Sequence, residues 1–183
     1  MDPLWKNALW EQFGATIDML ENAVNACPDT HWNGRLWIDH SDHPLPPEAS
    51  AFWYITYHTL FWLDLYLTGS VEGFAPPAPF TLDELDPAGV LPEHPYSKDE
   101  LHTYLVYLRK KCQATIAELS DEKAHRQVNF NWTRGKSVSF LELLVYNMRH
   151  VQEHGAQLNM FLGQNAVEVS DWVGQAKTDE GSE

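Results

Sequence analysis

Apolar side chains recur at helical spacing in four segments of this chain, and stretches rich in proline, glycine and aspartate separate the four. The first segment runs from about Pro3 to Ala26, with Asp2 placed to cap its N-terminus. The second, Ala49–Gly69, is apolar enough to suggest a membrane span. However, Asp64, His58 and several hydroxyl side chains interrupt it, and no lysine or arginine flanks it. We therefore expect a helix buried in a protein core.

Two more helices are predicted to begin at capping boxes, in which an N-cap serine is followed three residues later by glutamate. Ser97 and Glu100 mark the start of the third helix. Ser139 and Glu142 mark the start of the fourth, which we expect to end at Gly163. The predicted buried stripes of the first and third helices are Trp5, Leu9, Phe13, Ile17, Leu20 and Val24, and Leu101, Leu105, Leu108, Cys112, Ile116 and Leu119. Four such helices predict an all-α fold, a four-helix bundle.

The connections between the helices predict how the bundle is wound. Residues 70–96 contain six prolines and no helical period, whereas adjacent antiparallel helices need only about 2–8 connecting residues. This long crossover loop therefore predicts parallel second and third helices, in an up-down-down-up order. A small hairpin around Arg134-Gly135 is expected before the fourth helix. We assign residues 1–168 to a single domain and residues 169–183 to an acidic, flexible tail.

The charge balance is strongly acidic, with 12 lysines and arginines against 26 aspartates and glutamates and a formal net charge of −14. Such a chain repels nucleic-acid phosphates and anionic lipid, so we expect no nucleic-acid or membrane partner. Cys27 and Cys112 stand outside any Cys-x-x-Cys, which argues against a disulfide framework or a cysteine zinc site. The first residues lack a basic stretch followed by an apolar one, and we expect a cytoplasmic protein.

Three of the nine histidines turn towards the predicted core. His150 and His154 lie four residues apart on the fourth helix, so their Cβ atoms are about 5–6 Å apart and both rings can reach one metal ion. His58 lies on the second helix, well away from Asp64, which we take as the polar side of that helix. One divalent ion would satisfy three imidazoles that otherwise need three separate partners. We therefore predict a three-histidine metal site; the alternative is three ordinary core histidines.

Other residues are weaker candidates. His40 and His43 share an irregular loop with two aspartates, for which a solvated polar loop is the simpler interpretation. Asn147 and the aromatic neighbours of His58 could line a pocket, but packing is their favoured role. Glu153 lies between the paired histidines and points away from them, and no general base is identifiable. The two aromatic neighbours of His58 are Tyr54 and Trp62. The remaining weak candidates are His31, His94, His102 and His125.

With these residues in view, the chain resembles the DinB/YfiT-like family of metal-dependent enzymes. The resemblance rests on "ITYHTLFWLDLYL", on the HxxxH of "RHVQEHGAQLNMFLG" and on the long second connection, and it covers about residues 4–165. It implies a divalent ion on His58, His150 and His154, with open positions for water or substrate. Zinc or nickel is the first expectation for the metal, and iron or manganese is the next. It also implies a homodimer. In some members a low-molecular-weight thiol (bacillithiol, mycothiol or glutathione) takes part in S-transfer or isomerisation.

Two metal-based function classes follow from these residues, beside a third possibility, a metal-free bundle that acts as an interaction domain. The first is a metal-dependent enzyme acting on a small-molecule substrate, because such an ion makes a water or a thiol nucleophilic near neutral pH. A thiol-dependent S-transferase and a hydrolase both fit. The second is a non-catalytic metal- or ligand-binding bundle of the stress-response kind. A structural metal site normally has a fourth protein ligand, and the sequence offers no obvious fourth, which favours the enzyme.

Overall fold

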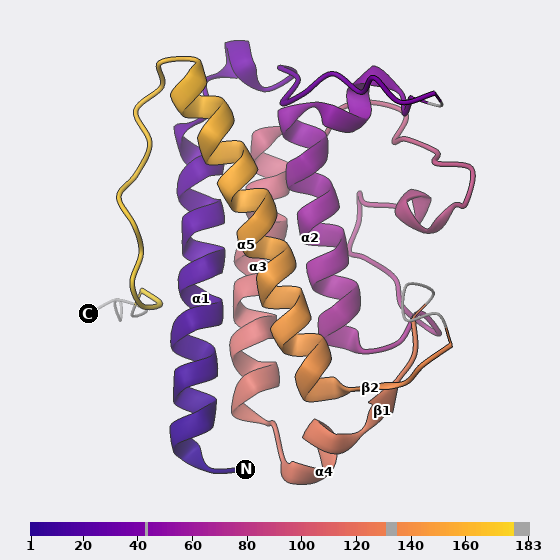
Figure 1. The fold of residues 1–183 in the computed structure, drawn as a ribbon, viewed down its shortest axis with the longest axis vertical. Coiled ribbons are helices and arrows are strands. Elements are labelled where there is room, and N and C mark those ends of the chain that lie inside the picture. The colour runs from indigo at the N-terminus through magenta and orange to yellow at the C-terminus, as the bar shows by residue number, and fades with distance from the viewer. Residues whose placement is uncertain (43, 131–134, 178–183) are drawn as a thin grey trace.

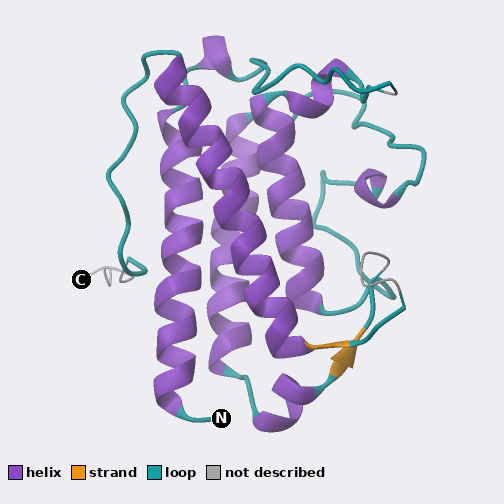
Figure 2. Ribbon diagram, in the orientation of Figure 1, coloured by secondary structure: helices purple, strands orange, loops and turns teal. Residues whose placement is uncertain are grey.

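The computed structural model describes residues 1–42, 44–130 and 135–177, and it is a bundle of four long helices (Figures 1 and 2). The four are α1 (Pro3–Ala26), α2 (Phe52–Thr68), α3 (Lys98–Ala117) and α5 (Phe140–Gln164). Helices α1 and α5 run in one direction and α2 and α3 in the other (Figure 1). The predicted all-α bundle with parallel second and third helices is therefore confirmed.

The helix ends follow the local sequence signals. The Asp2 side chain accepts a hydrogen bond from the backbone of the first turn of α1. Ser97 and Glu100 exchange the two hydrogen bonds of a capping box at the start of α3, and the Ser139 side chain caps α5. Gly69 ends α2 with φ of 78°, in the left-handed region that glycine adopts without strain. These ends fix the lengths of the helices that carry the site.

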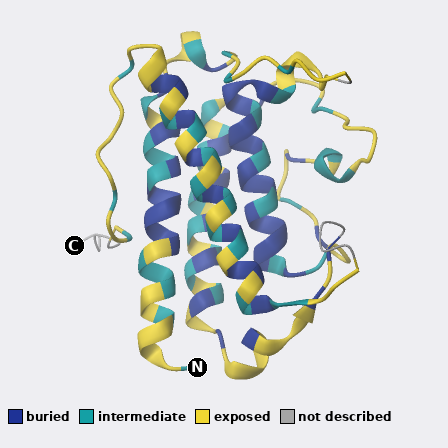
Figure 3. Cartoon of the chain, in the orientation of Figure 1, coloured by how far each residue is buried: buried dark blue, intermediate teal, exposed yellow. Residues whose placement is uncertain are grey.

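The core lies between the four helices, where the buried residues of each gather (Figure 3). Every side chain of the stripe predicted for α3 is buried. The stripe predicted for α1 is buried from Phe13 onwards, whereas Trp5 is 66% exposed. Trp5 was wrongly placed in the core because the first turns of α1 are not covered by the neighbouring side chains that bury its later turns.

Asp64 does not mark a polar side of α2, as we inferred from the sequence. It is buried, where it accepts a hydrogen bond of 2.7 Å from the Tyr104 hydroxyl and pairs with the ammonium of Lys111, both from α3. A second buried aspartate, Asp18, joins α1 to α3 through Arg109 at 2.7 Å. Helix α2 therefore buries most of its circumference, and a helical wheel could not distinguish a polar face on it.

The connections carry short elements. Residues 70–96 rise along the outside of α2 and include the short 3-10 helix η3 (Asp83–Leu85) (Figure 1). Two further 3-10 turns, η1 (Asp29–His31) and η2 (Pro47–Ser50), precede α2. A short helix, α4 (Asp121–His125), which the sequence reading missed, precedes two strands. Strand β1 (Gln127–Val128) pairs antiparallel with β2 (Val138–Ser139). This agrees with a hairpin, although Arg134 of its predicted turn lies outside the described residues.

The end of the chain returns along α1 (Figure 1). The backbone of Ala176 donates to Glu11 at 2.9 Å, and that of Lys177 donates to the Asp18 carboxylate at 2.6 Å. The domain boundary at residue 168 and the flexibility of residues 169–183 stay predictions. Among the described helices, none combines the length and apolar character needed to cross a membrane.

Candidate metal centre

Three histidines from two helices meet at one point. His58 lies in the middle of α2, and His150 and His154 lie one turn apart on the facing side of α5. The Nε2 atom of His150 is 3.3 Å from that of His58 and 3.1 Å from that of His154. The side chains are partly buried, with 26% of His58 exposed. The structure thus brings together all three predicted ligands.

Two neighbouring oxygens determine which ring nitrogens carry protons. The Nδ1 of His58 is 2.8 Å from a carboxylate oxygen of Glu84, and the Nδ1 of His154 is 2.7 Å from the amide oxygen of Gln157. The Gln157 amide oxygen and an ionised Glu84 carboxylate can only accept hydrogen bonds. The two Nδ1 atoms must therefore donate, so Nε2 is the atom of each ring that can offer a lone pair to a metal ion. These lone pairs point at the common centre.

The third ring, His150, is held neutral by its surroundings. Burial, reinforced by the nearby His154 and His58, lowers the pKa of His150 to about 2. Burial and His58 also lower the pKa of His154, although the hydrogen bond that its Nδ1 donates to Gln157 acts in the opposite direction. The Nδ1 of His150 is buried and has no hydrogen-bond partner among the described residues. Neutral imidazoles are the form that binds metal ions.

The donor set fits a divalent ion. Histidine nitrogens bind zinc at about 2.0–2.1 Å, so neighbouring ligand atoms should be about 2.9 Å apart at octahedral angles and about 3.4 Å apart at tetrahedral angles. The two measured Nε2 separations, 3.1 and 3.3 Å, lie within that interval. Within the described part of the chain, no fourth histidine, cysteine or carboxylate joins the group. The arrangement can hold an ion and leave coordination positions open.

The sequence matches the model of the DinB superfamily over residues 12–158. The chain belongs to the DinB superfamily. A solved structure, that of the DinB-like protein YjoA from Bacillus subtilis, superimposes with a TM-score of 0.59 at 14% sequence identity. The match covers 93% of this chain and 100% of that one, and it shows a shared fold. No curated protein matches the sequence.

Glu84 is the functional candidate of this DinB protein that sequence reading missed. It comes from η3 in the proline-rich connection, and only 6% of its side chain is exposed. The same carboxylate oxygen that contacts His58 also accepts a hydrogen bond of 2.8 Å from the indole of Trp62. Burial acts to raise the pKa of Glu84, but interactions with His58, Tyr54 and Trp62 outweigh it and lower that pKa. Glu84 is therefore an ionised carboxylate that orients a predicted ligand.

A cavity of about 330 Å³ opens on His58 and His154. One wall comes from the segment before α2 and includes Trp37 and Leu45, and the other comes from residues 83–91. The described residues that line it are Trp37, Leu45, Pro46, Ala49, Tyr54, Ile55, His58, Asp83, Glu84, Asp86, Gly89, Val90, Leu91 and His154. A ligand in this cavity would contact apolar side chains, carboxylates and two of the three histidines.

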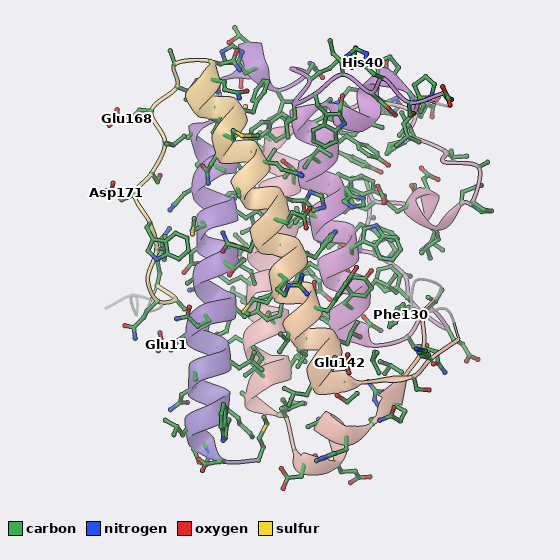
Figure 4. The ribbon with its side chains drawn as sticks, in the orientation of Figure 1. Glu11, His40, Phe130, Glu142, Glu168 and Asp171 are labelled. Atoms are coloured by element: carbon green, nitrogen blue, oxygen red, sulfur yellow. The ribbon has the colours of Figure 1, made fainter. Side chains whose placement is uncertain are left out.

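The remaining candidates divide between this pocket and the core. Tyr54 lines the cavity. Asn147 is fully buried and donates to a backbone oxygen of α2 at 3.1 Å, so packing is its role. Glu153 is exposed and, as expected, does not join the histidines. His40 lies exposed at the end of the bundle (Figure 4), and His43 lies outside the described residues. Four further histidines stay outside the cluster: His31, His94, His102 and His125.

Proposed function

We propose that this DinB protein is a metal-dependent enzyme of the hydrolase type, with one divalent ion held by His58, His150 and His154. The observation that carries the proposal is the convergence of these imidazoles beside an open cavity. Zinc or nickel suits a set of three imidazoles, and iron or manganese is also compatible. A structural site would use a fourth protein ligand, whereas a catalytic site keeps a position open for substrate or water.

A divalent ion on three neutral imidazoles supplies a strong Lewis acid, which makes a bound water or thiol nucleophilic near neutral pH. The residues of the chain prepare for that ion. Glu84 and Gln157 keep a proton on the Nδ1 atoms of His58 and His154, so that each Nε2 faces inward. The apolar walls beside the histidines limit the water that surrounds a bound substrate, which strengthens electrostatic interactions within the cavity.

Hydrolysis is favoured over thiol-dependent S-transfer by the charge of the cavity lining. Thiols such as glutathione carry carboxylates, which proteins usually bind with arginine or lysine. Among the described lining residues there is no arginine or lysine, and three are acidic: Asp83, Glu84 and Asp86. An anionic thiol would therefore meet repulsion on its way to the ion.

Metal analysis tests the centre directly. The purified protein should hold about one divalent ion per chain after zinc or nickel is supplied, and His58→Ala and His154→Ala should each lose it. His102→Ala is a matched control, because His102 contacts Glu21 away from the cluster and should leave metal content unchanged. A wild-type protein that takes up no metal would refute the metal centre.

Activity assays then test the reaction class. The metal-loaded protein should hydrolyse members of a panel of activated esters and amides, and His150→Ala should abolish that hydrolysis. The same panel should include bacillithiol, mycothiol and glutathione with electrophilic acceptors. Turnover only with a thiol would replace hydrolysis with S-transfer. Metal binding without turnover on either panel would instead favour a non-catalytic binding protein.

A further inference from the structure

The cavity beside the predicted metal centre has a particular combination of shape and charge. Its outer walls carry large apolar side chains that are open to solvent: Trp37 is 41% exposed, Leu45 62% and Val90 44%. Solvent-exposed apolar side chains grouped around a cavity are typical of a ligand-binding mouth. An aromatic or aliphatic body would bury them.

Three carboxylates line the same cavity. Asp83 and Asp86 accept local hydrogen bonds, at 2.5 Å from the Thr81 hydroxyl and at 2.8 Å from the backbone of Ala88. These bonds hold the two side chains on the loop that forms one wall. Lysine and arginine are absent from the described lining, so no side-chain cation there pairs with Asp83 or Asp86, and the opposing charge is that of an ion on the three histidines. The potential of this wall is therefore negative, as is the net charge of −14 of the whole chain.

Glu84 adds an independent sign of a missing ligand group. Its side chain is 6% exposed and lines the cavity, and one carboxylate oxygen already receives hydrogen bonds from His58 and Trp62. The other oxygen, Oε1, is buried without a hydrogen-bond partner among the described residues. Leaving a charged acceptor unpaired costs stability. Because Oε1 is buried, a ligand in the cavity would act on this charge through space, and a cation there would lower the cost of the buried carboxylate.

We propose that this cavity selects small organic cations with an apolar body, and that anionic compounds are excluded from it. The apolar body lies between Trp37, Leu45 and Val90, and the cationic group lies against the acidic wall. Tyr54 and Trp37 add aromatic faces, which attract organic cations. As the selectivity of the proposed enzyme, this inference rests on the proposed function. It identifies the substrate as an amine or ammonium compound whose reactive group reaches the histidines.

The test compares three probes of similar size on the zinc-loaded protein: benzyltrimethylammonium, benzyl alcohol and benzenesulfonate. The quaternary ammonium has no lone pair for the metal, and the sulfonate is a weak metal ligand. The same titrations on the metal-free protein remove the charge of the ion, so the comparison there reports on the charge of the wall. Calorimetry or NMR titration at low salt should show the cation binding about tenfold more tightly than the alcohol. This preference should weaken as salt rises, because charges at the mouth are screened.

Two charge-matched double variants separate a local effect from the net charge of the protein. Asp83→Asn with Asp86→Asn should abolish the preference for the cation while zinc binding stays unchanged, since asparagine keeps the local acceptor oxygens. Glu168→Gln with Asp171→Asn removes the same charge on the far side of α1 (Figure 4) and should preserve the preference.

The outcomes distinguish the selectivity from the metal centre. Tighter binding of benzenesulfonate than of benzyltrimethylammonium to a protein that holds zinc would overturn the cation selectivity and leave the metal centre standing. Equal loss of preference in both double variants would also overturn it, because the effect would then come from net charge alone. Failure to bind zinc would overturn the proposed enzyme, and cation binding by the metal-free protein would still decide whether the wall selects by charge.

Discussion

Replacing Glu84 should weaken metal binding even though Glu84 is not a metal ligand. Its carboxylate receives the Nδ1 proton of His58 at 2.8 Å, and this contact keeps the Nε2 lone pair directed at the centre. Without an acceptor at this place, the proton can move to Nε2 and the ring can rotate. Part of the binding free energy must then be used to restore the tautomer and the orientation.

The magnitude follows from which interactions each variant removes. Glu84→Gln keeps the size and one acceptor oxygen but loses the charge, and we expect zinc affinity to fall by about tenfold, or about 1.4 kcal/mol. Glu84→Ala removes the acceptor as well, and we expect a loss of about 100-fold, or about 2.7 kcal/mol. The order of the two variants matters as much as their values, because it separates the loss of charge from the loss of orientation.

The assay is competition for zinc with a chromophoric chelator at neutral pH. Unfolding of the metal-free variants by urea should accompany it, so that a loss of fold is not mistaken for a loss of affinity. Asp86→Asn provides the matched control, because Asp86 is on the same loop and accepts a hydrogen bond from the backbone of Ala88. Zinc affinities of Glu84→Gln and Glu84→Ala equal to that of the wild type would refute the orienting role of Glu84.

Three further predictions concern the stability of the metal-free protein. Because folding lowers the pKa of His150 to about 2, the unfolded state binds the extra proton. The free energy of unfolding should therefore fall as the pH drops below about 6.5, by about 2 kcal/mol at about pH 5. If the unfolding free energy of His150→Gln had the same slope against pH as that of the wild type, this prediction would be contradicted. Lys111→Met should cost about 3 kcal/mol because it leaves a buried carboxylate without its cation. In contrast, Lys123→Met, which breaks an exposed pair, should cost at most about 1 kcal/mol in the same urea titrations. Gly69→Ala should destabilise by at least about 1–2 kcal/mol, since its φ is 78° and a Cβ there would lie 2.5 Å from the Arg126 guanidinium; Gly163→Ala, with open space around it, should not destabilise.

Much of the fold could be predicted because its signals are local. Capping side chains, a helix-ending glycine and apolar spacing determine where α1 and α3 begin and which of their faces are buried. The length of the 70–96 connection was sufficient to predict that α2 and α3 are parallel. Trp5 and Asp64 were misplaced because burial depends on what a neighbouring element covers, and a single helix does not contain that information.

The candidate site shows the same division. His150 and His154 are related by one helical turn, so their proximity is a local property that a sequence can reveal. The contribution of His58 required the bundle to be assumed, and the structure does bring His58 to the other two histidines, although the polar side assigned to α2 was wrong. Glu84 had no signal of this kind, because its approach to His58 depends on the path of an irregular loop.

That path has a physical origin in the topology of the bundle. Two parallel helices in sequence oblige the chain to return the whole length of the bundle between them. In this protein the irregular returning segment runs along the outside of α2 (Figure 1), and its Glu84 contacts His58. The connection can therefore do more than join two helices: it delivers the Glu84 carboxylate to the back of one ring and builds the acidic wall of the cavity. Changes in this loop away from Glu84 should alter the proposed selectivity of the cavity while the histidines stay in place, since the helices carry the three rings and Glu84 is the loop residue that contacts His58. In the proposed enzyme, the loop would therefore determine substrate choice and the helices would hold the metal, with Glu84 as the loop residue that contributes to both.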